Sequence, residues 1–129
     1  MSTRGRSLLT IWIALLVLAG CQPKPRTDHA RQAEIGVEQL ARTPAAYEGR
    51  SLVLRGVVSS AAGEEHMFTV IDEAEYRSCR ELGCAAFEVP IAFVGTMPET
   101  ARTVRVVGRL EQPEPGRYVV RAERVDPVP

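Results

Sequence analysis

Apolar and polar positions along the chain predict five β-strands, at residues 51–59, 66–72, 86–93, 103–110 and 117–125. The first two segments are rich in apolar and β-branched residues. In the last three, apolar and polar residues alternate, as expected when successive side chains of a strand point to opposite faces of a sheet. A Pro-Gly sequence within residues 112–116 predicts a hairpin between the last two strands. Five short strands separated by turns predict a small barrel or a sandwich.

A weaker, helical periodicity precedes the first predicted strand. In residues 29–42 the apolar side chains recur near one helical face, and they are Ala30, Ala33, Val37 and Leu40. Gly36 weakens this pattern, so residues 34–37 can instead be extended. Pro44 ends the segment, because the residue before a proline disfavours the helical conformation.

Proline and glycine interrupt three of the predicted strands. Pro90 predicts that the third strand lies at an edge or contains a bulge. Gly56 and Gly108 lie inside the first and fourth strands. Glycine at such positions predicts a bend or a bulge where a barrel closes.

The first 20 residues have a different pattern from the rest of the chain. Arg4 and Arg6 are followed by an apolar run over residues 8–18 and then by small residues. This order predicts a helical secretory signal peptide. The run spans about 18 Å as a helix, which is shorter than a hydrocarbon core of about 30 Å. An uncleaved anchor helix is the alternative.

The end of the predicted signal resembles the lipobox of bacterial lipoproteins. The residues that carry this resemblance are Leu18, Ala19, Gly20 and Cys21. The resemblance implies that Cys21 becomes the first mature residue and carries acyl chains, and more than one chain is needed for durable anchoring. Gln22 implies sorting to the outer membrane. The predicted location is therefore a membrane-anchored lipoprotein that faces the periplasm.

Removal of the signal peptide changes the charge of the chain. The 129 residues contain 16 basic and 16 acidic residues, so the net charge is zero. Loss of Arg4 and Arg6 leaves 109 residues with 14 basic and 16 acidic ones, a net charge of −2. This balance argues against a nucleic-acid partner. The predicted organisation is a signal peptide (1–20), a lipidated tether (21–34) and a β-barrel domain (35–126).

Part of the domain resembles small OB-fold proteins of the bacterial cell envelope. The resemblance is carried by Leu40, Pro44, Tyr47, Gly49-Arg50, Leu52, Leu54 and Arg55-Gly56-Val57-Val58. It implies a mainly β fold, a five-stranded Greek-key barrel preceded by a short helix. Another small barrel or a sandwich remains the alternative.

Two cysteines remain once Cys21 is lipidated. Cys79 and Cys84 lie between the second and third predicted strands. In an oxidising compartment an even pair predicts a disulfide. A metal site that also uses His66, or a thiol–disulfide exchange site, is the alternative. The spacing of the two cysteines favours the structural disulfide.

Oligonucleotides and oligosaccharides bind OB barrels along the second and third strands and the adjacent loops. By this analogy the candidate binding surface comprises Phe68, Val70, Asp72, Tyr76, Glu88 and Pro90. The acidic residues Asp72, Glu73 and Glu75 are interpreted as a solvated strand end rather than as catalytic groups. Outward-facing arginines are expected to pair with Glu111 and Glu123.

These patterns predict a binding or assembly module of the envelope. The expected protein is not an enzyme, has no cofactor, and contacts the lipid membrane and an envelope protein. The alternative is a metal-binding or thiol-redox accessory protein that uses Cys79 and Cys84. A hydrolase that uses His66 is the least favoured of the three classes.

Overall fold

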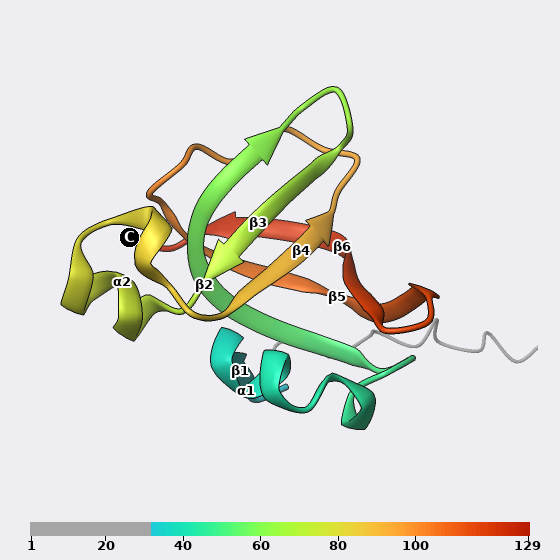
Figure 1. Cartoon of the computed structure of the whole chain (residues 1–129). Helices are drawn as coiled ribbons and strands as arrows, with labels where there is room; N and C mark the ends of the chain where they lie inside the picture. Colours follow the sequence, from blue (N-terminus) through green and yellow to red (C-terminus); the bar gives the residue numbers. More distant parts are fainter. Residues whose placement is uncertain (1–31) are drawn as a thin grey trace, which may run out of the picture.

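A computed structural model gives the fold of residues 32–129. The predicted signal peptide, Cys21 and most of the predicted tether lie outside these described residues. Six strands form one sheet: β1 (Glu34–Gly36), β2 (Ser51–Ala62), β3 (Met67–Ile71), β4 (Glu88–Ala92), β5 (Thr103–Glu114) and β6 (Arg117–Pro127). The sheet curls on itself into a small barrel (Figure 1).

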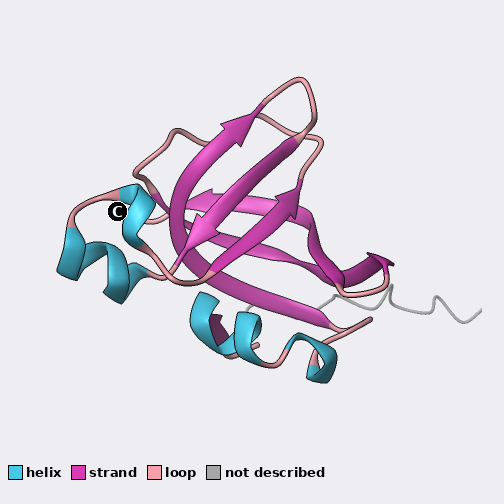
Figure 2. Ribbon diagram, viewed as in Figure 1, coloured by secondary structure: helices cyan, strands magenta, loops and turns pink. Residues whose placement is uncertain are grey.

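Four short helical segments lie outside the barrel wall (Figure 2). They are α1 (Val37–Arg42), the 3₁₀ turn η2 (Pro44–Ala46), α2 (Glu73–Cys79) and the 3₁₀ turn η3 (Leu82–Cys84). No helix in residues 32–129 is both long enough and apolar enough to cross a membrane. The OB-fold class predicted from the sequence is confirmed, with six strands rather than five.

The barrel closes because β2 pairs with different neighbours along its length. Its first half, Ser51 to Val57, pairs antiparallel with β5, and its second half pairs antiparallel with β3. The pairing register shifts between Val58 and Ser60, as at a β-bulge, and bulges bend a strand. The sheet order is β1-β2-β3-β4-β6-β5, and the β2–β5 pairing joins its two sides.

Apolar side chains fill the barrel interior. The largest of the fully buried ones are Phe68, Leu40, Leu54, Ile71, Ile91 and Leu110. Valines on β2, β3 and β5 pack between them, as expected of β-branched residues on a pleated surface. No buried polar or charged residue is found in residues 32–129, so burial of apolar surface is the main stabilising term.

Helix α1 covers one end of the barrel. Val37 is 0% exposed and Leu40 is 1% exposed, and both belong to the core cluster. The predicted helix over residues 29–42 therefore exists, but it begins at Val37 and ends at Arg42, two residues before Pro44. The extended alternative for the preceding residues is also realised, because residues 34–36 form β1, parallel to β2.

The connection between β3 and β4 differs from the sequence prediction. The sequence pattern predicts no helix in it, but it contains α2 and η3. Asp72 caps α2, because its side chain accepts hydrogen bonds from the backbone N–H groups of Ala74 and Glu75. Arg80, in a left-handed conformation (φ 65°), ends the helix.

The two strand glycines have different roles. Gly108 lies where the register between β5 and β6 shifts, so the predicted bulge is confirmed there. No register shift occurs at Gly56, so the bulge predicted as one alternative at that position is wrong. A Cβ atom on Gly56 would lie 2.9 Å from both the carbonyl oxygen of Ile71 and a methyl group of Val37. Glycine at this position lets α1 approach β2.

We expect Gly108→Ala to lower the free energy of unfolding by about 2–3 kcal/mol. The new methyl group would collide with the backbone of Arg121 and Ala122 on β6. Urea unfolding followed by circular dichroism measures this change as a lower midpoint at constant slope.

Gly83→Ala is the matched control, because no atom lies within 4 Å of a Cβ placed there. Its midpoint should be unchanged or slightly raised. Equal stability of the two variants would show that β5 and β6 do not approach each other closely at Gly108.

Candidate functional site

The barrel wall is incomplete along the seam between β4 and β6. All five residues of β4 pair with β3, but only Ile91 and Ala92 pair with β6. The half of β4 from Glu88 to Pro90 therefore has β3 as its only strand partner. On β6 this pairing begins only at Val120, three residues after the strand starts at Arg117.

Pro90 lies in β4 at a position where the backbone nitrogen is not needed for a hydrogen bond to β3. The N–H of Phe93 donates to the carbonyl of His66, 2.9 Å away, on the β3 side. Successive N–H groups of a strand point to alternate sides, so the nitrogen of Pro90 faces the seam rather than β3. The predicted edge position of Pro90 is confirmed for this half of the strand.

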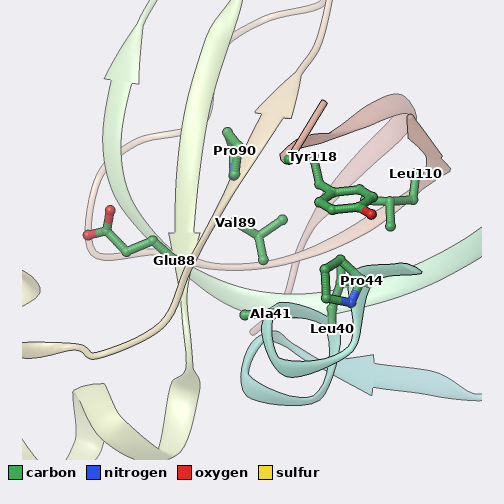
Figure 3. Close-up of a pocket in the computed structure, with 9 residues that line it drawn as sticks. Leu40, Ala41, Pro44, Glu88, Val89, Pro90, Leu110 and Tyr118 are labelled. Carbon is green, nitrogen blue, oxygen red and sulfur yellow. The ribbon is translucent and has the colours of Figure 1, made fainter. Parts of the chain in front are cut away.

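A recess of about 290 Å³ opens at the seam (Figure 3). It is bounded by α1, η2, β4 and the β5–β6 hairpin. The residues that line it are Leu40, Ala41, Pro44, Glu88, Val89, Pro90, Leu110, Gly116 and Tyr118. In Figure 3, Val89, Pro44 and the ring of Tyr118 face a common space, and the carboxylate of Glu88 points away from it. Most of the side chains around the recess are thus apolar, and polar groups also contribute to its lining.

The size and lining of the recess limit what it can accept. Its volume lies at the lower end of the range for small-molecule sites, and most of the side chains that line it are aliphatic or aromatic. It can take one apolar group of the size of a ring or a branched side chain.

Two residues of the predicted binding surface lie inside the barrel. Phe68 is 2% exposed and Val70 is 0% exposed, and both belong to the core cluster. Their assignment to a surface is wrong, because β3 turns this face inward. The outward residues of β3 are Met67 and Thr69, which are partly exposed.

The other predicted surface residues lie in two separate places. Asp72 and Tyr76 belong to the α2 region, where Asp72 caps the helix. Glu88 and Pro90 line the seam recess. The recess also involves Leu40, Pro44 and Tyr118, which sequence reasoning did not assign to a site. Leu40 and Pro44 were part of the OB-fold resemblance, but no local pattern indicated that they meet Tyr118.

The cysteines lie next to each other in the structure. The sulfur atoms of Cys79 and Cys84 are at bonding distance, and their Cα atoms are 6.6 Å apart. His66 precedes β3, whereas α2 follows it, so β3 separates the histidine from the cysteines. In residues 32–129 no group of three or more His, Cys, Asp or Glu side chains could hold a metal ion. The structure does not bring together the alternative metal set.

Acidic side chains at the end of β3 bind neighbouring groups rather than solvent alone. The Glu73 carboxylate lies 2.8 Å from the Arg55 guanidinium and 3.3 Å from that of Arg77. The hydrogen bond and the negative charge of Glu73 raise the pKa of Arg55. Glu75 accepts a hydrogen bond from the backbone N–H of Ala86. The interpretation as a solvated strand end is therefore incomplete.

Outward-facing arginines on β5 and β6 form ion pairs with acidic side chains. Arg121 on β6 contacts Glu111 on β5 at 2.9 Å, which confirms one predicted pair. Arg105 contacts Glu34 at 3.0 Å, so the end of β1 is attached to β5. Neutralised in this way, these arginines do not form a continuous basic face.

No family model and no curated protein matches the sequence. Solved structures do match the fold. The telomere capping protein Ten1 from Saccharomyces pombe is 16% identical with a TM-score of 0.50, over 74% of this chain and 80% of that one. The S. pombe Stn1–Ten1 complex gives 15% identity and a TM-score of 0.50, over 74% and 75% of the two chains.

A putative aspartyl-tRNA synthetase from Leishmania major is a third similar structure. It is 15% identical with a TM-score of 0.51, over 79% of this chain but only 22% of that one. The chain thus corresponds to one small part of the synthetase. At these identities the likeness establishes the fold and nothing further: the chain is built on an OB-type barrel.

We expect Asp72→Ala to lower the free energy of unfolding by about 1 kcal/mol, because two N–H groups at the start of α2 lose their acceptor. Thermal unfolding measures the loss. Glu64→Ala removes the same charge from the exposed β2–β3 turn and should have no measurable effect. An equal effect of both substitutions would mean that net charge, rather than the helix cap, determines stability here.

Proposed function

We propose that the chain is a lipid-anchored, non-catalytic binding module of the bacterial cell envelope, with an envelope protein as its partner. The observation that carries the binding role is the apolar recess at the β4–β6 seam, which lies in the wall of an OB-type barrel. The partner would insert an apolar side chain between Val89 and Tyr118. Buried apolar side chains of this kind supply much of the affinity in protein interfaces.

The outer face of β3 and β4 favours a protein partner over a nucleic acid. Strands β3 and β4 contain no lysine or arginine. The aromatic residue of β3, Phe68, points into the core. Single-stranded nucleic acid requires a positively charged groove and exposed aromatic rings on which bases stack. The partly exposed outward residues of these strands are instead Met67, Thr69, Pro90 and Ala92.

The anchoring role is supported by the sequence before the barrel. The Leu18-Ala19-Gly20-Cys21 motif follows a basic start and a short apolar run, in the order that export and lipidation require. Two or more acyl chains on Cys21 would hold the barrel at the membrane surface. Gln22 favours the outer membrane as the destination. A small module so attached can act by holding a partner near the membrane.

We expect Cys21→Ala to abolish lipid labelling and to leave the 129-residue precursor unprocessed. Cells expressing the chain are grown with radiolabelled palmitate, and the product is measured by fluorography and mass spectrometry. The matched control is the double substitution of Cys79 and Cys84 by alanine, which should leave labelling unchanged. Continued processing and membrane association of Cys21→Ala would disprove the lipoprotein proposal.

We expect a photoreactive benzoylphenylalanine at Tyr118 to form a crosslink to an envelope protein in living cells. The ring of Tyr118 lines the recess, so a partner seated there would lie within reach. Gel shift and mass spectrometry identify the adduct. The same probe at Thr100, on the exposed loop after β4, is the control. No adduct at position 118, or equal adducts at both positions, would exclude the recess as the partner site.

A further inference from the structure

The segment between β3 and β4 is attached to the barrel mainly by polar contacts. Helix α2 has seven residues, and none of them is buried. It packs against β2 without adding a side chain to the core cluster. Apolar burial, which holds α1 in place through Val37 and Leu40, therefore contributes little to holding α2.

The polar contacts that hold this segment are few and partly solvated. The Arg55–Glu73 ion pair has a distance of 2.8 Å, but the two side chains are 40% and 23% exposed. Ion pairs with this degree of exposure are weak. The Ala86 N–H donates to Glu75 at 3.3 Å, which is a long hydrogen bond. Non-covalent contacts alone thus give the segment a small preference for its closed position.

Two features of the closed position are unfavourable. The Oε2 atom of Glu75 is buried and has no hydrogen-bond partner in the structure. A buried carboxylate oxygen without a partner loses its hydration without compensation. Arg80 adopts the left-handed conformation, which is strained for a residue with a Cβ atom. Opening of the segment would hydrate Glu75 and relax Arg80.

The Cys79–Cys84 pair closes a short ring over this region. Cys79 ends α2, Cys84 ends η3, and both residues are exposed to solvent. Exposed disulfides are the class that exchanges readily with external thiols, whereas buried structural ones resist reduction. Arg77 and Arg80 lie beside Cys79 in the sequence, and positive charge favours the approach of an attacking thiolate.

We propose that the Cys79–Cys84 disulfide is a reversible exchange site for a dithiol reductant, and that its reduction releases residues 73–86 while the barrel stays folded. The disulfide holds a segment whose other contacts are weak and whose closed position leaves one carboxylate oxygen unpaired. The barrel does not depend on it, because the core cluster contains no residue between Asp72 and Ala86.

The dithiol supplies the two electrons and the protons that the reduction of the disulfide requires. One thiolate of the reductant attacks one sulfur of the pair, so that a mixed disulfide forms and the other cysteine leaves as a thiolate and takes up a proton. The second thiol of the reductant then attacks the mixed disulfide. The reductant ends as a disulfide, and Cys79 and Cys84 end as two thiols with two electrons gained.

The test uses the full processed chain, purified from membranes in detergent in its oxidised form. Dithiothreitol is added without denaturant, and alkylation by iodoacetamide is measured by mass spectrometry alongside amide hydrogen exchange. We expect both thiols to be alkylated and exchange within residues 73–86 to accelerate by about tenfold or more. Amides of β2 and β5 should exchange at an unchanged rate.

The control variant replaces Cys79 and Cys84 with serine. It should show fast exchange over residues 73–86 at all times and no response to dithiothreitol. Three results on the wild-type chain would overturn the proposal: alkylation only in denaturant, reduction without faster exchange in the segment, or reduction that unfolds the barrel. The first and third would make the disulfide a structural crosslink, and neither bears on whether the seam recess binds a partner.

Discussion

The pairing of β2 with two successive neighbours turns a flat sheet into a barrel. Its first half belongs to β5 and its second half to β3, and the register shift after Val58 lets one strand bend between them. Everything else in the structure follows from this bend. The interior is closed only because β2 joins both sides of the sheet, and α1 covers the end that β2 and β1 leave open.

The same closure explains why a recess exists at the opposite wall. β4 is five residues long and meets β6 along only two of them, so the wall is complete at one end of the seam and open at the other. Pro90 fits this geometry, because its nitrogen faces the side where no hydrogen-bond acceptor is required. A proline here also prevents an additional strand from pairing fully with β4, which leaves the opening suited to a side chain rather than to a strand.

Much of the fold is predictable from the sequence, because β2 and β3 are rich in β-branched and apolar residues and the later strands alternate. The start of α1 was harder to predict, because Gly36 and its neighbours are compatible with either a helical or an extended conformation. Strand β1 has only three residues, which are too few to show an alternation of apolar and polar side chains. Helix α2 was missed because it buries no residue and so leaves no apolar repeat in the sequence.

The binding surface was only partly predictable for a related physical reason. Alternation shows that Phe68 and Val70 share one face of β3, but it does not say which face is inside. That choice depends on closure of the barrel, which is a long-range property. Glu88 and Pro90 point to the recess, whereas Tyr118 joins it only because β6 lies beside β4 in space.

The position of β5 and β6 near the C-terminus has a consequence for a chain that is synthesised from its N-terminus. β2 emerges well before β5, the partner of its first half, and the seam forms only after Val120 has arrived beside Ile91. Until then the valines of β2 have nothing to cover them. Folding of this barrel therefore waits for its C-terminal strands, and until they arrive β2 is an apolar strand without its β5 partner.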